Sequence, residues 1–333
     1  MDIDFCRKYI SSHLPKSFFK PNFKRIFLLG AWLVLALLVI LYAKNIENRV
    51  ALFFLGILLG RLNATLAFFS HEVLHGSVVR SKFMQNFICL ISFAPFQVSP
   101  TFWRYWHNYL HHTHTQVPVN DPDCYFTHKM YLKSKVVRFF YMLAPGSGSL
   151  LSYLYLFYWF SFQALFLQFY GRFKLRIWRK IDNKKVNFEL LIQSSMFAIY
   201  VFLVKEKALY LILVPYIMQN YILMSYISTN HNLCPLRGEK EQLENSLSLK
   251  VTRISDFLDL NFSCHVEHHM FPTLSGEKLK IVKNLTISNF KESYNCLEKH
   301  KALICLYKTP RLYSEENVLI NPRTAEKFNT AKV

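Results

Sequence analysis

The sequence lacks the cysteine patterns that mark disulfide-stapled domains and thiolate metal sites. No C-x-x-C pair and no dense cluster occurs among its seven cysteines, Cys6, Cys89, Cys124, Cys234, Cys264, Cys296 and Cys305. A disulfide framework and a thiolate zinc site are therefore not indicated, and reduced thiols are expected. The chain also shows no internal repeat and no low-complexity tract.

Acidic residues are scarce: 21 Asp and Glu stand against 40 Lys and Arg, which gives a net charge of +19. Such an excess is compatible with nucleic-acid binding. The basic residues, however, form blocks beside hydrophobic segments, where they would meet anionic lipid headgroups. We therefore expect these charges to face a membrane surface, and we expect no nucleic-acid partner.

Apolar residues, in contrast, are abundant. Hydrophobic residues make up 52% of the 333 residues and aromatic residues 17%, with 31 Phe and 19 Tyr. This is more apolar surface than an ordinary soluble domain of this length would bury. The sequence predicts an all-α, multi-pass integral membrane protein.

Four apolar runs are predicted to cross the membrane, because each covers most of a hydrocarbon core of about 30 Å at about 1.5 Å per residue. These predicted spans are residues 26–43, 50–70, 187–204 and 208–228. Basic residues precede the first span and no cleavage motif follows it, so a cytosolic N-terminus and no cleaved signal are expected. The predicted organisation is a cytosolic basic segment (1–25), a membrane domain (26–275) and a cytosolic C-terminal segment (276–333).

Two other hydrophobic stretches are not predicted to cross. Residues 87–99 are too short and contain Pro95, which suits a re-entrant or interfacial segment. Residues 149–170 are long enough, but basic clusters flank both ends, so a single crossing would leave one cluster outside. An interfacial helix, or a hairpin that turns near "PGSGS" at 145–149, keeps both clusters in the cytosol.

The stretch "HEVLH" at 71–75 matches the H-E-x-x-H signature of zinc metallopeptidases. Two histidines four residues apart on a helix share a face and can hold a metal, but this spacing suits several metals. The pentapeptide alone therefore does not identify the site.

The distribution of the thirteen histidines is more informative. Nine of them follow predicted spans or gather in boxes on the same predicted side of the membrane: His71, His75, His107, His111, His112, His231, His265, His268 and His269. A zinc peptidase needs three ligands and would leave six of these unexplained. Nine imidazoles suit two metals with four to five nitrogen ligands each.

This pattern resembles the membrane fatty acid desaturase superfamily, in which three histidine boxes hold a di-iron centre at the cytosolic ends of a four-span bundle. The resemblance covers residues 50–275 and includes "NDPD" at 120–123, "TNH" at 229–231 and "HHMFP" at 268–272. It implies that the nine histidines bind two Fe ions on the cytosolic side, with O2 as co-substrate and a lipid or acyl chain as substrate. No catalytic residue beyond the metal ligands is predicted.

The resemblance also implies a supply of two external electrons per turnover. The chain contains no HPGG-type haem-binding module, so a separate ferredoxin or cytochrome b5-like donor is expected. Some acyl-CoA members carry an asparagine four residues before the isolated histidine, and Ile227 stands there in this chain.

Side chains close to the ligands are expected to accept hydrogen bonds from the imidazole rings and so fix their tautomers. The candidates for this role are Glu72, Asn230, Asp121, Asp123 and Glu267. The two aspartates flank Pro122, so a plain turn explains them equally well.

Several activities remain open at this stage. A desaturase that introduces a C=C bond is favoured, and a hydroxylase or ketolase of fatty acyl chains or carotenoids would use the same di-iron site. Both need an oxidant stronger than any side chain. An HExxH zinc protease leaves too many histidines unexplained, and a metal transporter would be expected to carry its ligands within the spans.

Overall fold

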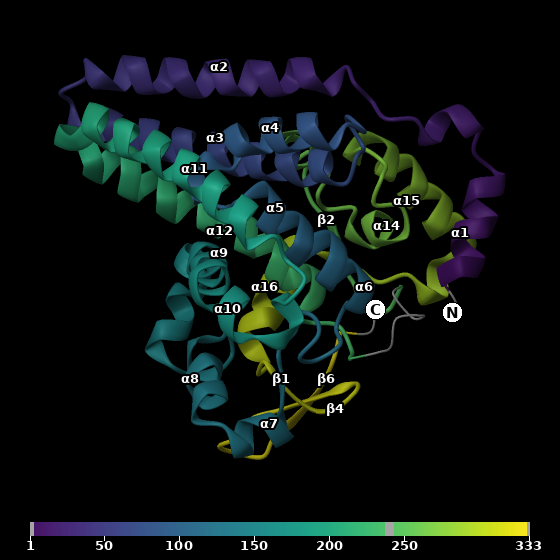
Figure 1. Ribbon diagram of the computed structural model, residues 1–333. Helices are drawn as coiled ribbons and strands as arrows, with labels where there is room; N and C mark the ends of the chain where they lie inside the picture. The colour runs from purple at the N-terminus through teal and green to yellow at the C-terminus, as the bar shows by residue number, and fades with distance from the viewer. Residues whose placement is uncertain (1–2, 237–242, 332–333) are drawn as a thin grey trace. The chain divides into compact units, whose positions relative to one another are not determined.

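The computed structural model describes residues 3–236 and 243–331, and the described chain is mostly helical (Figure 1). The chain divides into two compact units. We call residues 21–108 and 156–224 the helical unit, and residues 1–20, 109–155 and 225–333 the histidine unit.

The helical unit consists of long helices and short 3-10 or π turns, the latter two marked η. Its elements are α2 (Arg25–Lys44), α3 (Arg49–Leu74), α4 (Lys82–Ser92), η2 (Ala94–Phe96), α5 (Pro100–Trp103), most of α9 (Tyr155–Phe166), η5 (Leu167–Gly171), α10 (Arg172–Lys174), η6 (Arg176–Trp178), α11 (Asn183–Val204), η7 (Lys205–Lys207), η8 (Leu209–Leu213) and the first part of α12 (Val214–His231). The π-helix η3 (Arg104–His111) joins the two units along the chain.

Five helical stretches among the described residues are long and apolar enough to cross a membrane, which confirms the predicted membrane-type helical fold. They are Arg25–Lys44, Arg49–Leu74, Leu150–Lys174, Asn183–Lys207 and Leu209–His231. Three of them contain the predicted spans 26–43, 50–70 and 187–204, and Leu209–His231 contains the fourth, 208–228, except for its first residue. The additional stretch, Leu150–Lys174, is a 25-residue succession of helical turns, and a turn at residues 144–149 separates it from the helix before it. Its interfacial location stays a prediction.

The helix α3 carries the first histidine box. It begins at Arg49 because the side chain of Asn48 accepts hydrogen bonds from the backbone N–H groups of Val50 and Ala51, both at 3.0 Å. The helix continues past the predicted span boundary at residue 70 and ends at Leu74. His71 therefore lies in its last turn, and His75 follows directly.

A glycine brings α3 close to α12. A Cβ atom at Gly60 would lie 2.7 Å from both the backbone oxygen of Pro215 and the Cβ of Met218. Only glycine allows this approach, as is common where membrane helices pack tightly. The next residue, the half-buried Arg61, has a local partner, because its Nη2 donates to Thr65 Oγ1 at 3.2 Å.

The segment predicted as re-entrant begins within α4, which has 11 residues. At about 1.5 Å per residue this helix covers about 16 Å, well below a hydrocarbon core of about 30 Å. The 3-10 turn η2 follows it, and Gln97 then adopts a left-handed conformation with φ of 55°. The chain therefore turns here instead of continuing as a helix.

The histidine unit combines short helices with two small sheets. Its elements are α1 (Ile3–Ser12), η1 (Lys16–Phe19), α6 (His112–His114), β1 (Phe126–Thr127), α7 (His128–Lys133), α8 (Lys135–Leu143), η4 (Leu150–Leu154), β2 (Ser248–Lys250), α13 (Arg253–Leu258), α14 (His265–Met270), α15 (Gly276–Phe290), η10 (Lys291–Ser293), β3 (Cys296–Glu298), α16 (Lys299–Lys308), β4 (Leu312–Glu315), β5 (Val318–Ile320) and β6 (Lys327–Asn329). A core of buried apolar side chains, among them Ile10, Val266 and Val282, packs α1 and α14 against α15.

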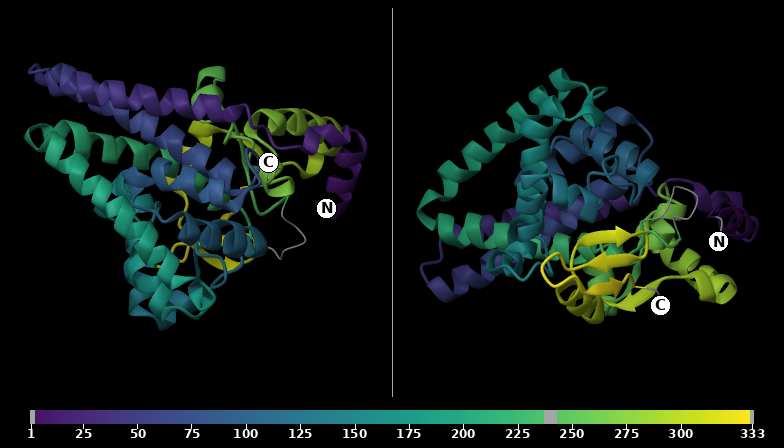
Figure 2. Two further views of the ribbon diagram at one scale, coloured as in Figure 1. Left: turned by 45° about the horizontal axis from the view of Figure 1, so that its top comes forward. Right: turned by 90° about the horizontal axis from the view of Figure 1, so that it is seen from below.

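The sheets join segments that are far apart in the sequence. One sheet has the order β1-β4-β5-β6, with β1 parallel to β4 and the other neighbours antiparallel. Figure 2 shows β4, β5 and β6 side by side as yellow arrows in its right-hand view. The other sheet pairs β2 with β3 in parallel. The predicted C-terminal segment is thus a folded part of the histidine unit.

Candidate metal centre

Four buried histidines form the first cluster, and all belong to the histidine unit. They are His111, His231, His265 and His269, each with a ring nitrogen within 4.8 Å of the others. His111 ends η3, His231 ends α12, and the other two lie one turn apart on α14. Three separate segments of the chain therefore supply the four rings. We call them the four-histidine set.

The Nε2 atoms of this set converge on one point. The Nε2 of His231 lies 3.2 Å from that of His111, 2.6 Å from that of His265 and 3.3 Å from that of His269. The Nε2 atoms of His265 and His269 are 3.2 Å apart. In five of the six pairs of rings within the set, the ring planes cross at 68° to 81°.

The opposite ring nitrogens of His111 and His231 face oxygen acceptors. His111 Nδ1 lies 3.0 Å from Asp121 Oδ1, and His231 Nδ1 lies 3.2 Å from the backbone oxygen of Asn245. A carboxylate and a carbonyl can only accept, so each Nδ1 carries the proton.

The same holds for the two rings on α14. In the amide orientation that satisfies both polar atoms of Asn230, its Oδ1 accepts from His265 Nδ1 at 3.2 Å. His269 Nδ1 lies 3.4 Å from Thr115 Oγ1, whose own hydroxyl donates to the backbone oxygen of His111 at 2.8 Å. Thr115 is therefore the acceptor in its contact with His269.

These acceptors determine the chemistry of the cluster. A neutral imidazole with its proton on Nδ1 presents only a lone pair at Nε2. Four such lone pairs face one another inside the protein, where they repel unless a cation lies between them. Histidine metal ligands characteristically donate their outer N–H to a carboxylate, carbonyl or similar group. The four-histidine set is thus able to bind a metal ion.

Electrostatics act in opposite directions on two of these rings. Burial, together with the neighbouring histidines, holds the pKa of His269 well below its usual value, so the ring is neutral at pH 7. Burial also acts to lower the pKa of His111, but the hydrogen-bonded carboxylate of Asp121 outweighs it and raises that pKa. Asp123 Oδ2, at 3.6 Å from His111 Nδ1, acts in the same direction.

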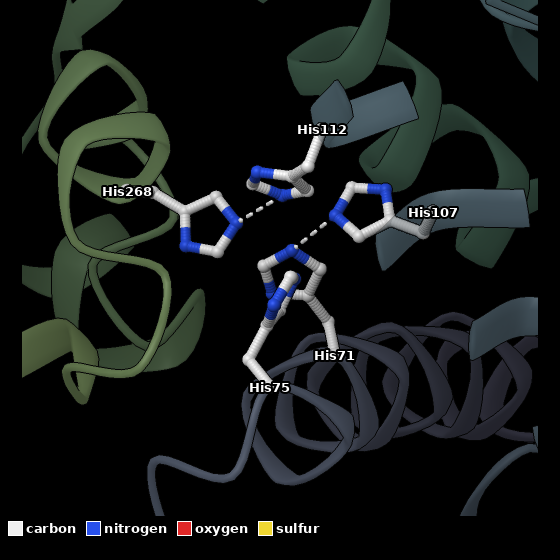
Figure 3. Close-up of side chains that lie close together, drawn as sticks. All are labelled: His71, His75, His107, His112 and His268. Atoms are coloured by element: carbon white, nitrogen blue, oxygen red, sulfur yellow. Dashed lines mark hydrogen bonds between the residues drawn. The ribbon is translucent and has the colours of Figure 1, made fainter. Parts of the chain in front are cut away.

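Three further histidines lie together in the helical unit. The Nε2 atoms of His71 and His107 are 2.8 Å apart, and the ring of His75 lies 4.8 Å and 5.2 Å from theirs (Figure 3). The ring of His107 stacks on Trp103 with a centroid distance of 5.2 Å. Asn108 donates to the backbone oxygen of Leu74 at 2.8 Å, which holds η3 against the end of α3.

The last two histidines form a pair within the histidine unit. The Nε2 atoms of His112 and His268 are 3.0 Å apart, and a dashed line joins these two rings in Figure 3. His112 follows His111 in the chain, and His268 precedes His269. Each member of this pair is therefore the direct neighbour of a member of the four-histidine set.

Glu72, the acidic residue of "HEVLH", forms a buried ion pair. Its carboxylate accepts from Arg25 Nε at 2.8 Å and from Arg25 Nη2 at 3.0 Å, and both side chains are 8% exposed. This bidentate contact ties the start of α2 to the last turn of α3.

Glu267, another candidate neighbour of the ligands, fastens α14 to β2. Its Oε2 accepts from Ser248 Oγ at 2.8 Å, and that hydroxyl in turn accepts from the backbone N–H of Val266 at 3.0 Å. Burial raises the pKa of Glu267 above its usual value.

The structure adds neighbours of the histidines that the sequence analysis did not include. Thr115 and Asn245 both accept from histidine rings of the four-histidine set, and Arg25 pairs with Glu72. Asn245 acts through its backbone oxygen, which any residue type would provide, so no sequence signal marks it. Thr115 lies one helical turn after His111, and this spacing is the only hint that the sequence offers.

The fatty acid desaturase family model matches residues 48–295. All nine histidines described above lie within that stretch. No curated protein matches the chain.

Proposed function

Because the chain belongs to the fatty acid desaturase family, we propose that it is a membrane-bound, O2-dependent di-iron oxidase that introduces a C=C bond into an acyl chain. The observation that carries the proposal is the four-histidine set, in which four Nε2 lone pairs converge and each Nδ1 faces an oxygen acceptor. This donor set fits a divalent transition metal that accepts imidazole ligands.

We assign one iron to the four-histidine set. We assign the second iron to the pair His112 and His268 of the histidine unit, and the family pattern implies that His71, His75 and His107 are iron ligands as well. Nine neutral imidazoles suit iron because they supply four to five nitrogen ligands to each ion. Removal of hydrogen from an unactivated methylene requires redox chemistry with O2. The two irons supply this chemistry when they are bound.

The residues of the chain prepare the site for this role. Asp121, Asn230 and Thr115 orient the rings that they contact and keep each proton on Nδ1. Burial of the four rings keeps water from competing for the Nε2 lone pairs. If the chain has the activity of the family, Glu72 is not the catalytic base that it would be in a zinc peptidase. Its ion pair with Arg25 suits a structural role near His71 and His75.

An apolar cavity in the helical unit supports an acyl substrate. Its volume is about 510 Å³, within the range of about 300–1,000 Å³ that small-molecule sites occupy. Side chains of α2, α3, α9, α11 and α12 line it, and Leu59 and Leu66 are its wall on α3. His71 follows Leu66 by five residues, which is about 7.5 Å along the helix axis. We assign the acyl chain of the substrate to this cavity.

The remaining parts of the proposal concern the surroundings of the enzyme. We place the iron site on the cytosolic side, because basic residues precede the first span and positive charge is retained in the cytosol. Electrons would come from a separate ferredoxin or cytochrome b5-like protein.

Lipid analysis of a host that expresses the chain tests the activity. Mass spectrometry with double-bond localisation should show a new unsaturated acyl chain that disappears when His265 is replaced by alanine. A hydroxylated or oxo product instead would indicate the hydroxylase or ketolase alternative on the same site.

Metal analysis tests the centre independently. Protein purified in detergent should contain close to two irons per chain. One stoichiometric zinc, together with a peptidase activity that Glu72→Gln abolishes, would contradict the desaturase proposal and support a zinc protease.

A further inference from the structure

Two arginines near the ends of the chain contact the helices that carry the four-histidine set. Arg7 belongs to α1, and Arg311 directly precedes β4. Both lie outside residues 48–295, the stretch that the family model matches. The segments that hold them are therefore features of this chain beyond the matched region.

Arg311 lies at the end of the ligand helix α12. Its side chain is completely buried, and its Nη1 donates to the backbone oxygen of Asn232, the residue after His231. Its Nη2 donates to the backbone oxygen and the hydroxyl of Thr309. Among the described residues, its hydrogen-bond partners are carbonyl and hydroxyl oxygens and not carboxylates.

Two other side chains bind carbonyls at the same helix end. Gln116 Nε2 donates to the backbone oxygens of His231 at 2.7 Å and Cys234 at 3.1 Å, and the hydroxyl of Tyr313 donates to the latter at 2.6 Å. The last carbonyls of a helix have no partner within it, and a buried carbonyl without a partner is costly. Side chains from outside α12 thus complete its C-terminal end.

The C-terminal segment adds backbone contacts to the same region. The N–H of Leu236 donates to the oxygen of Glu316, and the N–H of Ala331 donates to the oxygen of Leu233, both at 2.8 Å. Residues 233–236 are therefore bound to the segment that contains β4, β5 and β6. The backbone that follows His231 has little freedom to move.

Arg7 has the corresponding place at the end of α14. Its Nε donates to the backbone oxygen of Met270 at 2.8 Å, and its Nη2 donates to that of His269 at 3.0 Å. An ion pair with Asp4 at 3.2 Å helps to hold the guanidinium. The short helix that carries three of the nine histidines thus receives its terminal hydrogen bonds from the N-terminal helix α1.

The charge of the two arginines does not explain their position. A guanidinium repels a nearby metal cation, so its electrostatic effect alone would weaken metal binding. Metal sites, however, need their ligands held within about 0.5 Å of the productive geometry. The hydrogen bonds to the backbone beside His231 and His269 supply such a restraint.

We propose that Arg311 and Arg7 are positioning residues that fix the backbone of the metal-binding helices, so that the metal affinity of the four-histidine set depends on both terminal segments of the chain. This inference rests on the proposed function, because it requires that set to bind a metal. The two arginines should act differently. Arg311 restrains only His231, whereas Arg7 restrains α14, which carries ligands of both proposed iron positions.

Titration of the metal-free, full-length protein with Co²⁺ in detergent tests the inference. The visible absorption of Co²⁺ bound to imidazole reports occupancy of each site without any enzymatic turnover. Arg311→Met should weaken one of the two sites by about 10- to 100-fold, the usual effect of removing a residue that supports a metal ligand. Arg7→Met should weaken both sites. Arg311→Lys and Arg7→Lys should fall between wild type and the Met variants, because lysine keeps a donor group on one nitrogen but lacks the fork of the guanidinium.

Matched controls are Arg323→Met and Lys8→Met, since these exposed basic residues lie in the same two segments. Both should bind Co²⁺ like the wild type. If Arg311→Met does not fold, Arg311→Lys and Arg7→Met still decide the question. Unchanged or tighter Co²⁺ binding in these variants would overturn the inference. So would equal weakening of both sites in the Arg311 variants, which would indicate a general loss of structure. Failure of the wild type itself to bind Co²⁺ would instead contradict the proposed function.

Discussion

His111 Nδ1 lies 3.0 Å from Asp121 Oδ1, and both side chains are 1% exposed. The carboxylate also accepts from the backbone N–H groups of Gln116 and Asp123, each at 2.9 Å. The "NDPD" stretch is therefore a turn whose carboxylate binds a histidine ring at the same time. The two interpretations of this stretch, a turn and a contact with a histidine, describe one arrangement.

Asp121→Asn should weaken metal binding by about 10- to 100-fold, because it removes the charge that orients the His111 ring and keeps the proton on Nδ1. Metal content and Co²⁺ titration would measure the effect. Asp123→Asn is the matched control, since Asp123 lies farther from the ring, at 3.6 Å, and is more exposed. Equal effects of the two substitutions would mean that the turn, and not the contact with His111, is what matters.

His268→Ala should abolish lipid oxidation while the protein remains inserted and folded. The ring contacts His112 at 3.0 Å and lies outside the candidate spans, so its loss removes a ligand without disturbing the apolar helices. Product analysis and iron content are the measurements. Glu267→Gln should be milder, because glutamine can still accept from Ser248. Near-normal product formation by His268→Ala with unchanged iron would remove the third histidine box from the site.

The buried ion pair between Arg25 and Glu72 should show strong coupling. Arg25→Met alone leaves a buried carboxylate without its partner and should cost about 3–5 kcal/mol of stability. The double variant Arg25→Met with Glu72→Gln should recover part of this loss, because no unpaired charge remains. Denaturation of the wild type, both single variants and the double variant completes the cycle. Simple additivity of the two single effects would show that the ion pair does not couple the residues.

Residues 150–174 give the prediction about topology. We expect both termini and the segment around Lys184, which the structure places in the first turn of α11, to be accessible from the cytosol, because basic clusters flank this helical stretch on both sides. A single cysteine at position 184, in a background without accessible thiols, can be labelled with a membrane-impermeant reagent from either side. Labelling only from the non-cytosolic side would mean that the stretch crosses the membrane once.

The cavity in the helical unit makes a prediction about chain length. Leu59→Trp fills part of the cavity that we assign to the acyl chain, so turnover of long chains should fall more than turnover of short ones. Leu58→Trp is the control, because Leu58 lies on the same helix and is exposed at its outer surface. Product profiles with acyl chains of graded length would measure the change. Identical profiles for the two variants would place the acyl chain elsewhere.

Local patterns in the sequence were sufficient to predict the long helices. Uninterrupted apolar runs have no other way to satisfy their backbone in a membrane, so residues 26–43 and 50–70 appear within helices Arg25–Lys44 and Arg49–Leu74. The spacing of four between His265 and His269 likewise predicted that these rings can meet, and their Nε2 atoms are 3.2 Å apart.

Contacts between segments that are far apart in the chain could not be predicted from local patterns. The strands of the histidine unit have two to four residues each. In one of the sheets, β1 pairs with β4, so that Phe126 lies opposite Leu312. Such short strands have no detectable alternation of apolar and polar residues. Arg311 and Asn232 are 79 residues apart, and no pattern in the sequence predicts that they contact each other.

Two peptide bonds, one between His111 and His112 and one between His268 and His269, have a further consequence. Each bond joins a member of the four-histidine set to a member of the pair that we assign to the second iron. Adjacent Cα atoms are about 3.8 Å apart in any trans peptide. The backbones of the two rings in each neighbouring pair are thus linked covalently, and a substitution that shifts the backbone of one ring also shifts that of the other.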